Sequence, residues 1–186
     1  DKGFSHAEKL QGYITQVLTQ GNISKNDLDA IAVSKGPGSY TGLRIGVSTA
    51  KGLCYALDIP LIAISTLSSL ARQVTGSMVV PMLDARRMEV YSAVFSSEME
   101  QIREIQAQII TQDSFKTYLD RGQVTFIGDG VEKFEAVCTH PNAVFIKNAL
   151  PSASQMAKVA AHKLSANQTQ DVAYFEPYYL KDFISL

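Results

Sequence analysis

Apolar positions along residues 1–76 recur at helical spacing in some stretches and form short continuous runs in others. Helical spacing of three and four residues predicts amphipathic helices, and short apolar runs bounded by turn residues predict buried strands. The expected elements are a helix from Ser5 up to Gly21, a strand at Ala30–Ser34, a helix after Ser39 with Leu43, Val47, Ala50 and Cys54 on one face, a strand at Leu61–Ile64 and a short helix at Thr66–Gln73.

Residues 77–186 begin with strand patterns. Alternating side chains at Glu89–Phe95, preceded by a short turn-forming segment, predict a hairpin. The expected elements are strands at Val79–Leu83 and Glu89–Phe95, a third strand within Arg103–Ile110, a helix near Asp113–Arg121, a strand at Val124–Ile127, a helix near Val131–Cys138, a strand at Val144–Ile146 and a helix at Ser154–Leu164.

The two halves share one order of elements. The first reads α-β-α-β-α and the second β-β-β-α-β-α-β-α, so the first equals the second without its three leading strands. A βββαβαβ unit used twice is the plan of actin-like folds. We therefore expect an α/β, two-lobed actin-like fold (ASKHA, duplicated ribonuclease H-like), with lobes at residues 1–76 and 77–186 and the C-terminal tail in the second. We also expect that the first lobe lacks its N-terminal strands in this sequence. The expected sheet cores include Ile31, Val33, Ile62, Ile64, Val80, Leu83, Val94 and Ile127.

Composition narrows the function classes. The 186 residues carry 17 Lys plus Arg and 18 Asp plus Glu, a net charge of −1. Proteins that hold nucleic acid through their own electrostatics have a basic excess, which this chain lacks. No apolar run approaches the length of about 18 residues that a membrane helix needs. We expect a cytoplasmic protein with no membrane contact.

The segment Lys35–Gly42 is rich in glycine and joins a predicted strand to a predicted helix. Two interpretations stay open: exposed N–H groups that cradle a phosphate, or a tight turn in which glycine permits positive φ. Gly42, Gly46 and Ala50 follow at four-residue spacing, which allows close helix packing. Arg44 is either a solvated charge or an interface anchor.

The sequence contains no strong motif for catalysis or for metal binding. The three histidines, His6, His140 and His162, form neither HxxxH nor HExxH. Cys54 lies on an apolar helix face, which favours a core role. Asp84–Arg87 is expected to be a surface turn, and an anion contact made by its two arginines is the alternative interpretation. We predict no catalytic residue, no metal ligand and no cofactor-binding residue. The aromatic run Tyr174–Phe183 is expected to be an extended tail held by its rings.

Four segments resemble the bacterial TsaB family, formerly YeaZ. They are Lys35–Gly46 (KGPGSYTGLRIG), His6–Leu10, Asp84–Tyr91 (DARRMEVY) and Glu176–Lys181. The first is the most specific, and all four occur in the family's order over nearly the whole chain. The sequence departs from the family in lacking the N-terminal strands and in a short connection at Leu70–Ser77.

The resemblance implies a non-catalytic subunit of the complex that forms N6-threonylcarbamoyladenosine at position 37 of tRNAs reading ANN codons. Its implied partners are a catalytic TsaD-like subunit and a TsaE-like ATPase, with a homodimer when TsaD is absent. ATP or ADP and metal are then expected on those partners, and tRNA is contacted only through the complex. The alternative is an enzyme of the same fold, either a metal-dependent glycoprotease-like peptidase or a small-molecule ATPase.

The predicted partner interface combines the first helix with the helix after the glycine turn. Tyr13 lies off the apolar stripe of its helix, and Arg44 flanks the turn. Interfaces favour apolar surface with aromatic and Arg anchors. The predicted interface residues are Leu10, Tyr13, Ile14, Tyr40, Thr41, Gly42, Leu43, Arg44, Gly46 and Val47.

Overall fold

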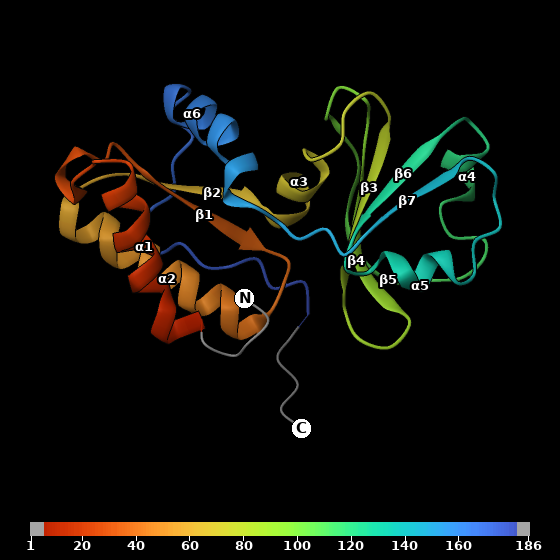
Figure 1. Ribbon diagram of the computed structural model, residues 1–186, viewed down its shortest axis with the longest axis horizontal. Coiled ribbons are helices and arrows are strands. Elements are labelled where there is room, and N and C mark those ends of the chain that lie inside the picture. Colours follow the sequence, from red (N-terminus) through yellow and green to blue (C-terminus); the bar gives the residue numbers. More distant parts are fainter. Residues whose placement is uncertain (1–5, 182–186) are drawn as a thin grey trace.

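The chain forms two β-sheets with a short helix between them (Figure 1). The computed structural model describes the backbone of residues 6–181, with side chains from residue 9 onward in that range. The helical elements are α1 (His6–Gln20), η1 (Lys25–Asp27), α2 (Tyr40–Leu57), α3 (Thr66–Ala71), α4 (Lys116–Leu119), α5 (Val131–Glu135), η2 (Ala153–Gln155) and α6 (Ala157–Ser165). Their order along the chain, together with that of the strands, confirms the expected series of elements in both halves.

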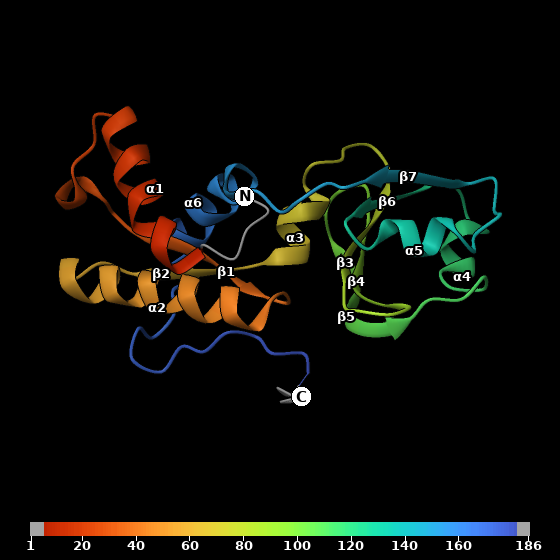
Figure 2. The ribbon, with the colours of Figure 1, turned by 60° about the horizontal axis from the view of Figure 1, so that its bottom comes forward.

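The first sheet contains two parallel strands, β1 (Ile31–Gly36) and β2 (Leu61–Ser65). Helix α2 covers one face and α6 packs on the opposite face of β2 (Figure 2). Since both faces of β2 are covered, Ile62 and Ile64 are almost fully buried, as expected. Ile31 and Val33 of β1 are only half-buried and pack at the margin of the cluster formed by Ala50, Cys54 and Leu61. The prediction that they lie inside the sheet core is therefore corrected.

The second sheet has the order β5-β4-β3-β6-β7. Strand β3 runs antiparallel to β4 and parallel to β6, which creates a mixed sheet. The strands are β3 (Met78–Asp84), β4 (Glu89–Phe95), β5 (Gln101–Ile109), β6 (Val124–Gly128) and β7 (Ala143–Lys147). The α/β class is confirmed, whereas the duplication of one unit and the boundary at residue 76 stay predictions.

A cluster of phenylalanine rings fills the space between the second sheet and helices α4 and α5. Phe126 of β6 lies at its centre, with ring centroids 4.7 Å from Phe134 and 5.5 Å from Phe115. Phe145 of β7 stacks on Phe126 at 5.6 Å. Aromatic pairs at such separations add to the stability from apolar burial. This cluster gives the second sheet a core that does not depend on the first.

Helix α3 lies between the two sheets and contacts both (Figures 1 and 2). Toward the first sheet, the Thr66 hydroxyl is 2.5 Å from the Ser34 hydroxyl. Toward the second, Leu70 is fully buried and packs against Gly128, where a Cβ would lie 2.9 Å from Leu70 Cδ2. A helix enclosed on several sides in this way fixes how the sheets meet.

Strand β5, at the edge of the second sheet, carries a half-buried arginine, Arg103. Arg103 donates from Nη1 to Gln108 Oε1 and from Nη2 to Ser92 Oγ, both at 2.6 Å. Its Cζ lies 4.7 Å from the Phe115 ring centroid. Burial lowers the pKa of Arg103 below its ordinary value. Within residues 6–181 its buried Nε has no hydrogen-bond partner.

Gly128 provides a test of how tightly the second sheet is built. Its φ is +132°, and a Cβ there would lie 2.0 Å from the carbonyl oxygen of Met82. We expect Gly128→Ala to lower the free energy of unfolding by about 3 kcal/mol, from backbone strain plus this collision. Urea unfolding followed by circular dichroism measures the change.

The matched control is Gly52→Ala in α2, where no atom lies within 4 Å of the added Cβ. An alanine in a helix interior is expected to raise stability there by about 0.5–1 kcal/mol. Equal effects of the two substitutions would contradict the close approach at Gly128.

Candidate functional site

The glycine turn between β1 and α2 is shaped by a close backbone approach. Gly36 has φ +108°, and a Cβ there would lie 2.7 Å from the carbonyl oxygen of Tyr178. Both observations require glycine at this position. Ser39 caps α2 by accepting a hydrogen bond at its Oγ from the Gly42 N–H at 3.3 Å. The tight-turn interpretation therefore accounts for Gly36.

The segment that meets Gly36 is a C-terminal strap, residues 170–181. It begins where the Gln170 N–H donates to the Leu61 carbonyl at 2.8 Å, and the Tyr178 N–H later donates to the Lys35 carbonyl at 2.7 Å. The rings of Tyr179 and Tyr40 have centroids 4.8 Å apart. In Figure 2 the strap runs alongside α2. The expected tail held by its rings is confirmed in part: Phe175 and Tyr179 pack on the first half, whereas residues 172–174 form a turn and Tyr174 is 85% exposed. Residues 182–186 lie outside the described part.

Lys51 holds the middle of the strap to α2. Its Nζ donates to the carbonyl oxygens of Ala173 and Phe175, both at 3.0 Å. Hydrogen bonds from a charged donor are stronger than neutral ones, at about 1.5–3 kcal/mol. This role was missed from the sequence, because a lysine in a helix gives no sign of a partner more than a hundred residues away.

The predicted interface residues of α1 lie on the outside of the molecule. Leu10 and Ile14 are half-buried and Tyr13 is 48% exposed. Val17, from the same apolar stripe, is 66% exposed. No α1 residue from 9 to 20 is buried, although the helix contacts α2. The expected packing of α1 beside α2 is confirmed, and it leaves the apolar stripe of α1 largely uncovered.

The predicted interface residues of α2 point in different directions. Arg44 and Thr41 are exposed, whereas Tyr40, Gly42 and Gly46 are half-buried. Arg44 lies over the Tyr40 ring, with its Cζ 5.0 Å from the centroid.

Three of the predicted interface residues on α2 face the chain's own sheet. Leu43 is 9% and Val47 3% exposed, since they belong to the apolar face that α2 turns toward β1 and β2. A Cβ at Gly46 would be 4.0 Å from Val33 of β1. An interface role for Leu43 and Val47 does not fit this position, because buried side chains cannot meet a partner. A Leu43→Glu variant would disrupt the core.

The turn Asp84–Glu89 joins β3 to β4 and is tied into a network of charges. Arg86 and Arg87 are exposed and have φ of 70° and 48°, so both lie in the left-handed region. Asp84 pairs with Lys133 Nζ at 2.9 Å. Glu89 pairs with Lys181 of the strap, which joins the strap to the second sheet.

The titratable residues singled out in the sequence lie apart from one another. Cys54 is 1% exposed, and burial raises the pKa of its thiol. His140 Nε2 is 3.5 Å from Asp120, and His162 lies on the exposed side of α6. The His6 side chain lies outside the described ones. Among the described residues no three His, Cys, Asp or Glu side chains gather as a metal site, and no helix is long and apolar enough to cross a membrane.

A scan against protein families finds one described as TsaD, tRNA N6-adenosine threonylcarbamoyltransferase, whose model matches residues 4–184. A curated relative is the tRNA threonylcarbamoyladenosine biosynthesis protein TsaB of Haemophilus influenzae. It is 29% identical over 194 residues, which cover 97% of this chain and 82% of the relative. TsaB of Escherichia coli is 27% identical with the same coverage.

Solved structures agree with these matches. YeaZ from Pseudomonas aeruginosa superimposes with a TM-score of 0.83 at 26% identity, covering 94% of this chain and 84% of that one. A second Pseudomonas aeruginosa structure, titled as similar to peptidase YEAZ, gives a TM-score of 0.85 at 25% identity, covering 95% and 84%.

The strap contacts can be tested through Lys51. We expect Lys51→Met to release the strap, because the Ala173 and Phe175 carbonyls lose their charged donor, and to speed chymotrypsin cleavage after Tyr174 or Phe175 about tenfold. Mass spectrometry of the released peptides gives the rate.

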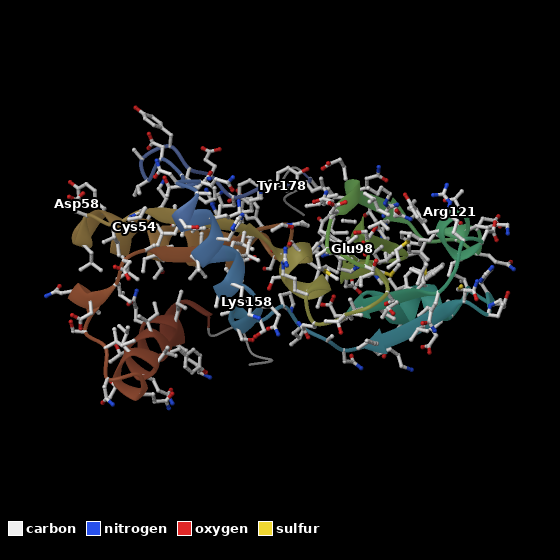
Figure 3. All side chains as sticks on the ribbon, turned by 90° about the horizontal axis from the view of Figure 1, so that it is seen from above. Cys54, Asp58, Glu98, Arg121, Lys158 and Tyr178 are labelled. Carbon is white, nitrogen blue, oxygen red and sulfur yellow. The ribbon has the colours of Figure 1, made fainter. Side chains whose placement is uncertain are left out.

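Lys158→Met on α6 is the control, because Lys158 is exposed and forms no hydrogen bond or ion pair with the described residues of the strap (Figure 3). Cleavage of the Lys51 variant at the parent's rate would mean that Lys51 does not hold the strap.

Proposed function

Because the chain belongs to the TsaD family and, within it, to the TsaB (YeaZ) proteins, we propose that it takes part in forming N6-threonylcarbamoyladenosine in tRNA. We propose that its role is to bind and activate a catalytic TsaD-type subunit in the cytoplasm. A TsaE-type ATPase joins this pair, and a second copy of the chain occupies the same surface when the catalytic subunit is absent.

The uncovered stripe of α1 is the observation that carries this proposal. A helix in a globular protein normally buries its apolar stripe, because propensity alone rarely holds a helix in water. Here Val17 is 66% exposed, and Leu10 and Ile14 of the same stripe are only half-buried. A partner that covers the stripe would bury this apolar area. Two helices from a related subunit, packed against α1 and α2, would supply such a cover as a helical bundle.

We define the α1–α2 surface as the exposed and half-buried residues that these two helices present to solvent. They are Leu10, Tyr13, Ile14 and Val17 of α1 with Tyr40, Thr41 and Arg44 of α2. Leu43, Val47 and Gly46 are left out because they face the first sheet. The combination of apolar area, two tyrosines and one arginine is that of interface anchors.

A non-catalytic role is supported by the turn after β3. Ligands bind α/β sheets at the carboxyl ends of parallel strands, which here places Asp84 and Asp129 together. Asp129 Oδ1 accepts from the Asp84 N–H at 2.9 Å, and Lys133 already neutralises the Asp84 carboxylate. We propose that ATP or ADP and metal are bound by the partner subunits instead.

Reconstitution of the modification tests the proposed role. With tRNA, threonine, bicarbonate, ATP, a carbamoyl-adenylate synthase and the TsaD- and TsaE-type subunits, modified adenosine should form only when this chain is added. Alone it should bind tRNA weakly, because its net charge of −1 attracts few phosphates. Peptide hydrolysis or ATP turnover by the chain alone would favour the alternative enzyme functions.

The α1–α2 surface predicts the effect of one charge. Val17→Asp should weaken association with the TsaD-type subunit by about 2 kcal/mol, since it places a carboxylate in an apolar contact. Because Val17 is 66% exposed, the free chain should keep its stability. Calorimetric titration gives the affinity.

Leu150→Asp is the matched control, since Leu150 is 60% exposed in the loop before η2 and lies outside the surface. Equal affinities of the Val17 variant and the parent would place the interface elsewhere on the chain.

A further inference from the structure

A groove of about 340 Å³ lies between α2 and the strap. One wall is the side of α2 that carries Arg44, Ser48 and Lys51, and the other is the strap itself. The lining residues are Arg44, Val47, Ser48, Lys51, Phe175, Glu176, Pro177 and Tyr179. The groove thus has mixed walls, in which the apolar side chains of Phe175 and Pro177 lie beside the cations Arg44 and Lys51 and the carboxylate of Glu176. Arg44 also belongs to the α1–α2 surface.

The Arg44 guanidinium is held in position by an aromatic ring, and no carboxylate of the described side chains pairs with it. Its Cζ lies 5.0 Å from the Tyr40 ring centroid, and the Tyr40 ring in turn packs on Tyr179 at 4.8 Å. A cation over an aromatic face is attracted by the ring. Among residues 9–181, whose side chains the structure describes, no Asp or Glu forms an ion pair with Arg44, and this includes Glu176 on the opposite wall.

The groove is a built feature, because both of its walls are fixed. Lys51 Nζ bonds two strap carbonyls, and the Tyr178 N–H bonds the Lys35 carbonyl. Figure 3 shows Tyr178 near the middle of the molecule, where the two sheets meet. A site whose walls are in place before binding loses less entropy when it is occupied.

We propose that this groove receives an aspartate or glutamate side chain of the TsaD-type subunit, which pairs with Arg44. This inference rests on the proposed function and makes the strap a second part of the partner interface. Arginine presents parallel N–H donors that match the two oxygens of a carboxylate. The half-buried ring of Phe175 would exclude water from the pair. Tyr179 acts as a positioning residue, because it supports the ring on which Arg44 lies.

Affinity for the TsaD-type subunit, measured by calorimetry in about 50 and about 300 mM NaCl, tests this assignment. Arg44→Met should weaken binding about tenfold or more in low salt and should reduce its salt dependence. The affinity of Arg44→Lys should lie between that of the parent and that of Arg44→Met, since lysine keeps the charge but loses the paired donors. Arg121→Met, in the turn between α4 and β6, is the matched control, and its affinity should stay within about twofold of that of the parent (Figure 3).

Variants of two strap residues separate the positioning of Arg44 by the Tyr179 ring from the effect of the Glu176 charge. Tyr179→Ala should weaken binding several-fold. Tyr179→Phe keeps the ring and should bind the TsaD-type subunit as tightly as the parent does. Glu176→Gln should bind at least as tightly as the parent, because it removes a carboxylate that competes for Arg44. Weaker binding by Glu176→Gln would overturn the assignment, and so would parent-like binding by Arg44→Met.

The outcomes distinguish this inference from the proposed function. If Val17→Asp weakens the complex but Arg44→Met does not, the partner interface stands and the groove has no part in it. If no complex forms with the parent chain, the proposed function fails. If Arg44→Met weakens self-association in sedimentation equilibrium but leaves the TsaD-type complex unchanged, the groove belongs to a contact between two copies of the chain.

Discussion

The packing of α3 between the two sheets is the constraint on which the rest of the molecule depends. Thr66 meets Ser34 of the first sheet, Leu70 packs against Gly128 of the second, and the Ser69 hydroxyl donates to the Ser152 carbonyl at 3.0 Å. One short helix therefore links both sheets and the segment that leads to α6. Because dense interiors deform little, the position of α3 sets the position of the turns that flank it.

Helix α2 serves three contacts with three sides. Its apolar face, with Leu43 and Val47, packs on the first sheet, and a second side holds the strap through Lys51. The third side, next to α1, is the one that we propose for a partner. This division explains why the small and apolar residues of α2 are required by the chain itself. What the helix can offer a partner is its first turn, where Tyr40 and Arg44 lie next to Tyr179.

The local elements could be predicted from the sequence because the signals that specify them are local. The strand at Leu61–Ile64 is a continuous apolar run, and the glycine turn lies where expected. The placement of α6 on β2 was not predictable, since periodicity shows which face of a helix is apolar but not which sheet covers it. The same limit applies to Lys51 and the strap. Val47 shares an apolar helix face with Cys54, and this pattern already predicts that Val47 is buried. The prediction that Val47 also lies in a partner interface is inconsistent with that pattern.

Arg103 has a consequence for how the molecule behaves in a crowded solution. An edge strand such as β5 offers its outer row of backbone groups to any other strand, which is a common start of aggregation. Arg103 points inward from this strand, onto Ser92 of β4 and the Phe115 ring, and an inward-pointing charge is one of the devices by which natural edge strands resist such pairing. The register shifts between β4 and β5 make the edge less regular as well. The cost is a buried Nε that has no hydrogen-bond partner among the described residues.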